Sequence, residues 1–214
     1  MRTIAIAFLA LALGAALPQL PARAQSSPVP AAGSALMPDG FGNVVLGMAQ
    51  ADLRRARPAA QEGGFQGDNA GYPKMLFERH PSDYIEQVIY LFDQAKPELS
   101  GVVFINPGQA PARAAAGFRS ATLKKWGLPD NAGYARGDGG ERQVALLWRR
   151  GDAVIVASYP ADKTGAATVR IGRRGSDTDT YAAAVDGMAP AVRQQLMQEL
   201  RTQLNQAPAG AAFR

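Results

Sequence analysis

Four arginines have the residue type and spacing best suited to binding chemistry: Arg149, Arg150, Arg173 and Arg174. The first pair opens an Arg-Arg-Gly-Asp stretch that is typical of a tight hairpin turn between two strands. The hairpin joins the strands expected at 143–148 and 153–159, and a third strand is expected at 167–172. If this third strand runs antiparallel to the second, Arg173 and Arg174 return to the same end of the sheet as Arg149 and Arg150. Guanidinium groups bind planar anions such as phosphate and carboxylate, so these arginines are the candidate anion-binding residues.

The alternative for the four arginines is ordinary solvated charge. Asp152, Asp177 and Asp179 lie close in the sequence and would partly balance them. The stretch GSDTDT around Asp177 and Asp179 also has the beginnings of a calcium-binding loop, but the glycine and the terminal glutamate of such a loop are missing. We therefore interpret these two acids as a turn and helix cap, and we predict no metal site.

Groupings of catalytic residues are weak in this sequence. His80, the sole histidine, lies near Ser82 and Asp83. Three such neighbours in an extended loop do not converge as a catalytic triad does, and no glycine-flanked nucleophile elbow surrounds the serine. Acids that hydrolysis would need occur nearby, at Glu78, Glu86, Asp93 and Glu98. Nothing singles out a pair among them, so we predict no catalytic residue and no cofactor.

The amino terminus reads as a secretory signal peptide. Arg2 gives a positive start, the run 4–17 is apolar, and Ala22-Arg23-Ala24 fits the rule for cleavage after Ala24. A membrane span needs about 20 apolar residues, which neither this run nor any later one provides. An uncleaved membrane anchor is the alternative. We expect a periplasmic or secreted protein with no transmembrane segment in the mature chain.

Composition narrows the classes of protein that the mature chain can belong to. Removal of 24 of the 214 residues leaves 190, enough for one sizeable core. The absence of cysteine excludes a lipid-modified cysteine, a thiol nucleophile and thiolate zinc sites. The formal charge of +5 falls to +3 when Arg2 and Arg23 leave with the signal peptide. That charge is too small to indicate nucleic acid as a partner.

Apolar periodicity and turn residues divide the mature chain into helices and strands. We expect helices at 49–56, 112–126 and 190–204, and strands at 72–78, 85–92, 101–106, 143–148, 153–159 and 167–172. Short links between the strands favour antiparallel hairpins. A helix followed by three strands thus occurs twice, at 46–106 and 112–172, as a topological hint without obvious sequence identity.

The predicted fold class is α+β, with two helix-plus-antiparallel-sheet halves and a C-terminal amphipathic helix. The predicted segments are a signal peptide at 1–24, a flexible linker at 25–40, an α+β domain at 41–174, a C-terminal helical segment at 175–206 and a disordered tail at 207–214.

The joint Leu46-Gly47-Met48 connects an extended segment to the first helix. Glycine at such a joint also begins phosphate-binding loops, but those loops need further glycines and a Lys-Ser/Thr pair, which this one lacks. We interpret the joint as a bend that lets Leu46 and Met48 face the core. Asp52 stands where a capping box has its acid, but Ala49 occupies the cap position, so the box is half missing.

The strand followed by Leu-Gly-Met, a short helix and antiparallel strands resembles small exported α+β modules of bacteria. Two named relatives of that group are the β-lactamase inhibitory protein and the small lipoprotein (BamE, also called SmpA or OmlA) of the outer-membrane β-barrel assembly machine. The stretch LKKWGLPDN…VALLWRRGDAVIVASY is similar to the second half of many periplasmic proteins of this kind. The resemblance covers about residues 41–172. It implies binding to, or assembly of, another envelope protein, although without cysteine this chain cannot carry the lipid anchor.

The sequence therefore predicts a non-enzymatic binding or envelope-assembly module that meets another envelope protein through a sheet face or a helix. Two alternatives stay open. One is a hydrolase acting on an envelope polymer, which a carboxylate pair in a deep pocket would favour. The other is a protein that recognises anionic lipid or polysaccharide through the arginine edge. A shallow apolar sheet face would favour protein binding over a hydrolase.

Overall fold

The computed structural model describes residues 34–62, 75–79, 85–106, 112–136, 142–161 and 166–206. A short 3-10 helix, Ser34–Leu36, begins the described chain. The α-helices are α1 (Gln50–Ala56), α2 (Ala112–Trp126), α3 (Thr178–Asp186) and α4 (Pro190–Gln206). The strands are β1 (Gln61–Glu62), β2 (Met75–Arg79), β3 (Gln87–Phe92), β4 (Leu99–Asn106), β5 (Asn131–Arg136), β6 (Arg142–Arg150), β7 (Ala153–Pro160) and β8 (Ala167–Arg173).

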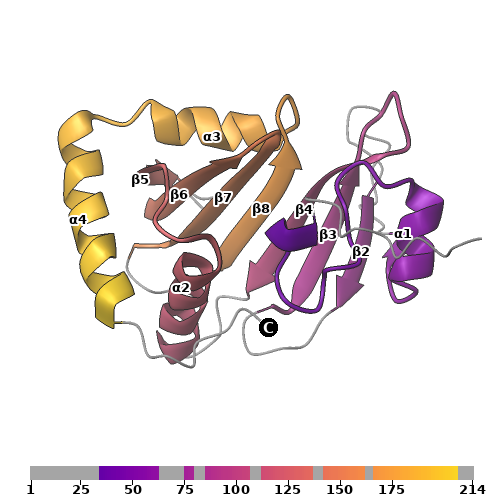
Figure 1. The fold of residues 1–214 in the computed structure, drawn as a ribbon, viewed down its shortest axis with the longest axis horizontal. Coiled ribbons are helices and arrows are strands. Elements are labelled where there is room, and N and C mark those ends of the chain that lie inside the picture. Colours follow the sequence, from indigo (N-terminus) through magenta and orange to yellow (C-terminus); the bar gives the residue numbers. More distant parts are fainter. Residues whose placement is uncertain are drawn as a thin grey trace, which may run out of the picture.

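All the strands belong to one antiparallel sheet in the order β1-β2-β3-β4-β8-β7-β6-β5. Two consecutive hairpin series, β1 to β4 and β5 to β8, are joined where β4 pairs with β8. Each series follows a helix, α1 or α2, and α4 closes the described chain (Figure 1). The predicted α+β class, its two helix-plus-sheet halves and the C-terminal helix are therefore confirmed. Among the described residues, no helix has the length and apolar character to cross a membrane.

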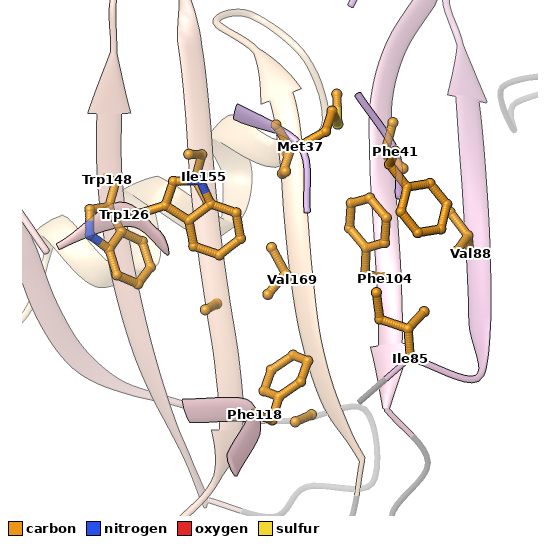
Figure 2. Packing of buried hydrophobic residues seen from close by; sticks show 14 of the residues in the cluster. Met37, Phe41, Ile85, Val88, Phe104, Phe118, Trp126, Trp148, Ile155 and Val169 are labelled. Atoms are coloured by element: carbon orange, nitrogen blue, oxygen red, sulfur yellow. The ribbon is translucent and has the colours of Figure 1, made fainter. Parts of the chain in front are cut away.

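One face of the sheet, here called the front face, carries the main hydrophobic core. Alternate residues of the strands point into it, including Val88 of β3, Phe104 of β4 and Val169 of β8. Phe118 and Trp126 of α2 pack over these strands beside Trp148 of β6 (Figure 2). The indole nitrogens of Trp126 and Trp148 donate to the Leu36 and Gly127 carbonyls, each at 3.0 Å. Burial of both rings is thus achieved without leaving an indole N–H unpaired.

The segment before α1 completes this core. Met37 and Phe41 are 1% and 0% exposed, and the Phe41 ring meets Phe104 edge-on with centroids 5.0 Å apart (Figure 2). In the last part of the lead-in expected to be flexible, Met37 and Pro38 are therefore buried, while Asp39 and Gly40 are exposed. The apolar side chain of Met37 is the physical reason, because its burial offsets the entropy lost in ordering the chain.

The opposite face, here called the back face, has a smaller core under α3. Ala182 and Val185 of α3 pack there on four strand residues, Ala145, Leu147, Val154 and Val156. The helix lies against β5, β6, β7 and β8. α4 packs on β5 and α2 at the same half of the molecule (Figure 1).

The strand β5 and the helix α3 were not expected from the sequence, and neither were the short β1 and the 3-10 helix. The strand β5 has the sequence NAGYAR, which carries no branched residue, and only Ala132 and Tyr134 of it face the front core. The helix α3 was interpreted as a turn and cap within a helical segment that began its amphipathic period at Pro190. Its apolar stripe consists of little more than Ala182 and Val185, too short a pattern to detect by periodicity.

Candidate functional site

The strand register brings the four candidate arginines to one end of the sheet. Arg150 pairs with Ala153, and Ala153 pairs with Arg173, so these two arginines point to the same face. Arg149 precedes Arg150 in β6 and points to the other face, whereas Arg174 lies in the turn after β8. The arginines share an end of the sheet but do not converge on one point.

Three of the four arginines have a carboxylate partner. Arg149 pairs with Asp186, Arg150 Nη1 lies 3.3 Å from Asp130 Oδ2, and Arg173 Nη1 lies 3.4 Å from Glu98 Oε2. Their remaining donors reach carbonyls: Arg150 donates to Trp126 at 3.0 Å and Arg173 to Leu46 at 3.3 Å. Arg174 donates to the Gly151 carbonyl at 3.4 Å. These contacts fit arginines that tie loops and helix ends to the sheet.

Asp186 shows how tightly the first of these pairs is coupled. Partial burial by itself would raise the pKa of Asp186. The hydrogen bonds from Arg149 and Asn131, and the positive charges of Arg149 and Arg193, outweigh it and lower the pKa of this carboxyl below its ordinary value. The Asn131 amide donates to it at 2.9 Å, so Asp186 fastens the end of α3 to β5 and β6.

The Leu46-Gly47-Met48 joint has the geometry of a structural element. Gly47 has φ of 88°, a left-handed conformation, and its N–H donates to the Leu99 carbonyl at 2.8 Å. A Cβ at this position would lie 1.7 Å from Arg173 Nη2. The glycine therefore provides room for the guanidinium that bonds to Leu46. A side chain here would collide with that guanidinium and would also strain the backbone.

The acids considered for hydrolysis are scattered. Glu78 is 5% exposed on the front face, where Arg57 and Tyr90 hold it; the Tyr90 hydroxyl donates to Oε2 at 2.8 Å and Arg57 Nε at 2.9 Å. Burial and the Glu78 carboxylate raise the pKa of Tyr90. Asp93 accepts the Ala95 N–H at 2.7 Å in its own turn, while Glu98 pairs with Arg173.

His80, Ser82 and Asp83 lie outside the described residues. Within the described ranges, no group of three or more histidines or acids is placed to hold a metal ion. Asp177 begins α3 with φ of −51° and ψ of −30°, and its side chain caps no N–H there. The expected turn is present, but the expected cap by Asp177 is not. Instead, Asp179 accepts the backbone N–H of Gly175.

A different surface stands out on the back face of β2, β3 and β4. Six apolar side chains form it, in adjacent cross-strand rows: Met75, Phe77, Ile89, Leu91, Val103 and Ile105. Five of them are only half-buried, whereas Val103 on β4, the strand next to β8, is 3% exposed. α3 packs on this same face of the sheet but over β5 to β8. We call these six residues the open face.

The open face is bordered by two arginines and a tyrosine. Arg79 ends β2 in the row of Gln87 and Ile105, and Arg170 of β8 continues the row of Val103 on the neighbouring strand. The Arg170 guanidinium lies 4.0 Å from the centroid of the Tyr181 ring on α3, which is 37% exposed. No carboxylate belongs to this face of β2, β3, β4 or β8 within the described residues.

A pocket of about 200 Å³ lies where the open face meets the start of α3. Leu91 and Gly101 form its strand side, and Ser176, Asp177 and Thr178 form its helix side. Gly172 lets the hydroxyls approach, because a Cβ there would lie 2.3 Å from the Thr178 oxygen. The pocket extends the open face toward α3, and the two acids that line it, Asp93 and Asp177, are both exposed.

Sequence reasoning did not locate this surface, although a signal existed. The strands MLFER, QVIYLF and LSGVVFIN are apolar on both faces rather than alternating. Strands of this kind predict cover on both sides of the sheet. A local pattern could not show that, among the described residues, the helix that covers this side of the sheet lies only over β5 to β8.

The comparisons with known proteins identify no family for this chain. No family model matches it. No curated protein matches it. Among solved structures, a DUF4309 family protein (YjgB) from Bacillus subtilis subsp. subtilis str. 168 is similar over 66% of this chain and 91% of its own, with a TM-score of 0.46 and 13% identity. Nothing in these comparisons links the chain to the group of the β-lactamase inhibitory protein, so that resemblance stays a prediction.

Proposed function

We propose that this chain is a non-enzymatic binding module of the bacterial envelope, periplasmic or secreted, which holds another envelope protein against the open face. The observation that supports the proposal is the uneven cover of one sheet face. Half-buried apolar side chains such as Phe77, Ile89 and Leu91 remain on β2 and β3, while α3 covers the neighbouring strands. Contiguous apolar surface of this kind is typical of protein–protein interaction sites.

The two alternative functions have less support. A hydrolase would need two carboxylates facing one another in a deep pocket. Glu78 is bonded to Arg57 and Tyr90, and Glu98 to Arg173. The acids at the pocket, Asp93 and Asp177, are exposed. An anion-binding edge would need free guanidinium groups, yet Arg149, Arg150 and Arg173 each have a carboxylate partner. An external anion would have to displace those partners.

Site-specific photo-crosslinking in cells that express the full chain tests the proposal. A photoreactive amino acid at position 89 or 91 should form adducts with an envelope protein. The same group at Val192, a half-buried apolar position on α4, is the matched control and should not. Adducts from position 192 alone, or from none of the three positions, would contradict a binding role for the open face.

A further inference from the structure

We infer that the open face receives an amphipathic helix of its partner, with carboxylates beside its apolar stripe. This inference rests on the proposed function and names the class of partner. It follows from three observations: the way in which α3 already docks on the same sheet, the width of the open face, and the charges at its border.

The helix α3 shows what this sheet face accepts. It presents Ala182 and Val185 to the strands, and its terminal carboxylate Asp186 pairs with Arg149 of β6. At its other end the Tyr181 ring covers the guanidinium of Arg170. This sheet face is therefore covered, over β5 to β8, by a short acidic helix with a narrow apolar stripe. Arginines of the strands hold that helix in place.

The width of the open face suits one such helix. Three strands about 4.8 Å apart give a surface of roughly 10–15 Å, close to the 10–12 Å diameter of a helix with its side chains. Its rows run Met75–Leu91, Phe77–Ile89–Val103 and Gln87–Ile105. Apolar side chains lie both along the strands and across them. The angle between a docked helix and the strands can therefore follow the direction of the helix's apolar face.

The charges at the border favour an acidic helix over a basic one. Arg79 is exposed and Arg170 half-buried at the border of the open face, and neither has an ion pair among the described residues. Asp93 and Asp177 lie at one end, beyond Leu91, around the pocket. Two open faces packed with the same ends together would bring like charges near one another, and like charges at an interface oppose association.

Two synthetic peptides test the inference. Both are about 18 residues long, since shorter helices are marginal in water, and share one leucine and alanine stripe. One carries glutamates beside the stripe and the other lysines. Titrated into the intact secreted protein, the glutamate peptide should bind about tenfold more tightly at low salt, and added salt should reduce the difference. Amide chemical shift changes should centre on β2, β3 and β4.

Variants identify which groups cause the preference. Changing Arg79 and Arg170 together to glutamine should remove the tenfold difference, whereas Arg149→Gln, whose partner is Asp186 of α3, should leave it unchanged. Ile89→Asp should abolish binding of both peptides. A matched Val192→Asp variant on α4 should bind as the unchanged protein does, and circular dichroism should show that each variant is folded.

Each contrary result has its own meaning. Equal binding of the two peptides, or a preference for lysine, would overturn the acidic partner while leaving the open face as a binding surface. Failure of both peptides, with crosslinks to an envelope protein still formed from position 89, would overturn the helix and keep the proposed function. A dimer that Ile89→Asp dissociates, or a crosslink from position 89 within the same chain, would assign the surface to a second copy or to a segment of this chain instead.

Discussion

The two halves of the sheet have the same strand order but different cover on the back face. In the half built from β5 to β8, Val154 and Val156 are 1% and 3% exposed beneath α3. In the half built from β2 to β4, the equivalent side of the sheet carries Phe77, Ile89 and Leu91, all half-buried. The comparison shows that apolar residues on a strand predict a sheet face that must be buried. Whether the same chain buries that face depends on the segment that follows the last strand of the half.

Chain connectivity explains which half is covered. After β8 the chain turns through Gly175, at φ of 82°, and runs back over the sheet as α3. After β4 the chain is committed to α2, which packs in the front core of the other half. The first half therefore has no following helix of its own, and its back face is the place where an external helix would complete the pattern.

The largest contrast that we expect between the halves concerns their ion pairs. Glu78→Ala would leave the Arg57 guanidinium and the Tyr90 hydroxyl buried without their shared partner, since the two side chains of the pair are 14% and 5% exposed. We expect a loss of about 3–5 kcal/mol in the free energy of unfolding.

The control for that variant is Arg149→Ala in the covered half. The Arg149–Asp186 pair has side chains that are 37% and 42% exposed. Its loss should cost about 1 kcal/mol or less, because water screens such pairs. Urea denaturation monitored by tryptophan fluorescence measures both. Similar losses for the two variants would contradict the distinction between a buried and a solvated pair.

Two left-handed glycines, one in each half, give the next contrast. Valine at Gly47 or at Gly151, where φ is 88° and 61°, should cost about 1–2 kcal/mol from backbone strain. At Gly47 the side chain must also displace the Arg173 guanidinium from the Leu46 carbonyl, which adds about 1 kcal/mol, whereas nothing lies within 4 Å of a Cβ at Gly151. Thermal unfolding of both variants checks the order. A larger loss at Gly151 would show that Arg173 contributes nothing at the joint.

Cover by α3 can be tested within a single cross-strand row. Ile89 and Val156 belong to the row that runs from Phe77 through Val103 and Arg170. Val156→Thr would bury a hydroxyl beneath α3 and should cost about 1–2 kcal/mol, while Ile89→Thr on the open face should cost less than about 1 kcal/mol. Equal shifts in the urea midpoint would mean that the open face is covered as well as the other half is.

Much of the fold could be predicted from local patterns. The helix α2 was predicted with its observed bounds, because Gly127 and Pro129 mark its end and its apolar spacing is regular. The β6–β7 hairpin followed from its Arg-Arg-Gly-Asp turn, and so did the arrival of Arg173 at the same end. Each of these features depends on residues that are close in sequence.

The parts that sequence reasoning missed depend on distant residues. The acids that hold Arg149 and Arg150 are Asp186 and Asp130, far from them in the chain, so their pairing could not be read from spacing. The open face was missed for the same reason. It is left uncovered because α3 packs over β5 to β8, and the residues of β2 and β3 do not indicate where α3 will pack.

Acid sensitivity is a smaller effect that belongs to the covered half. The hydrogen bonds and charges around Asp186 lower its pKa in the folded protein. A carboxyl with a lowered pKa contributes stability above its unfolded value of about 4, and that contribution disappears as the pH falls through the folded value. The stability difference between the unchanged protein and Asp186→Asn should therefore shrink below about pH 4. A difference that is constant from pH 7 to pH 3 would show that the carboxylate charge is not involved.

The smallest expected effect compares how the helices α1 and α3 begin. Ala49 is exposed at the N-cap of α1, with φ of −67° and ψ of 151°, an extended geometry in which a serine oxygen can accept a backbone N–H of the first turn. Asp177 at the N-cap of α3 has helical dihedral angles, so its side chain caps nothing. Ala49→Ser should therefore stabilise the protein by about 0.5–1 kcal/mol, because it restores the cap beside Asp52. Asp177→Ala should change the free energy of unfolding by less than about 0.5 kcal/mol. The opposite result would be a loss of stability in Asp177→Ala and no change in Ala49→Ser. It would mean that the backbone dihedral angles at the N-cap do not determine whether a capping side chain stabilises the helix.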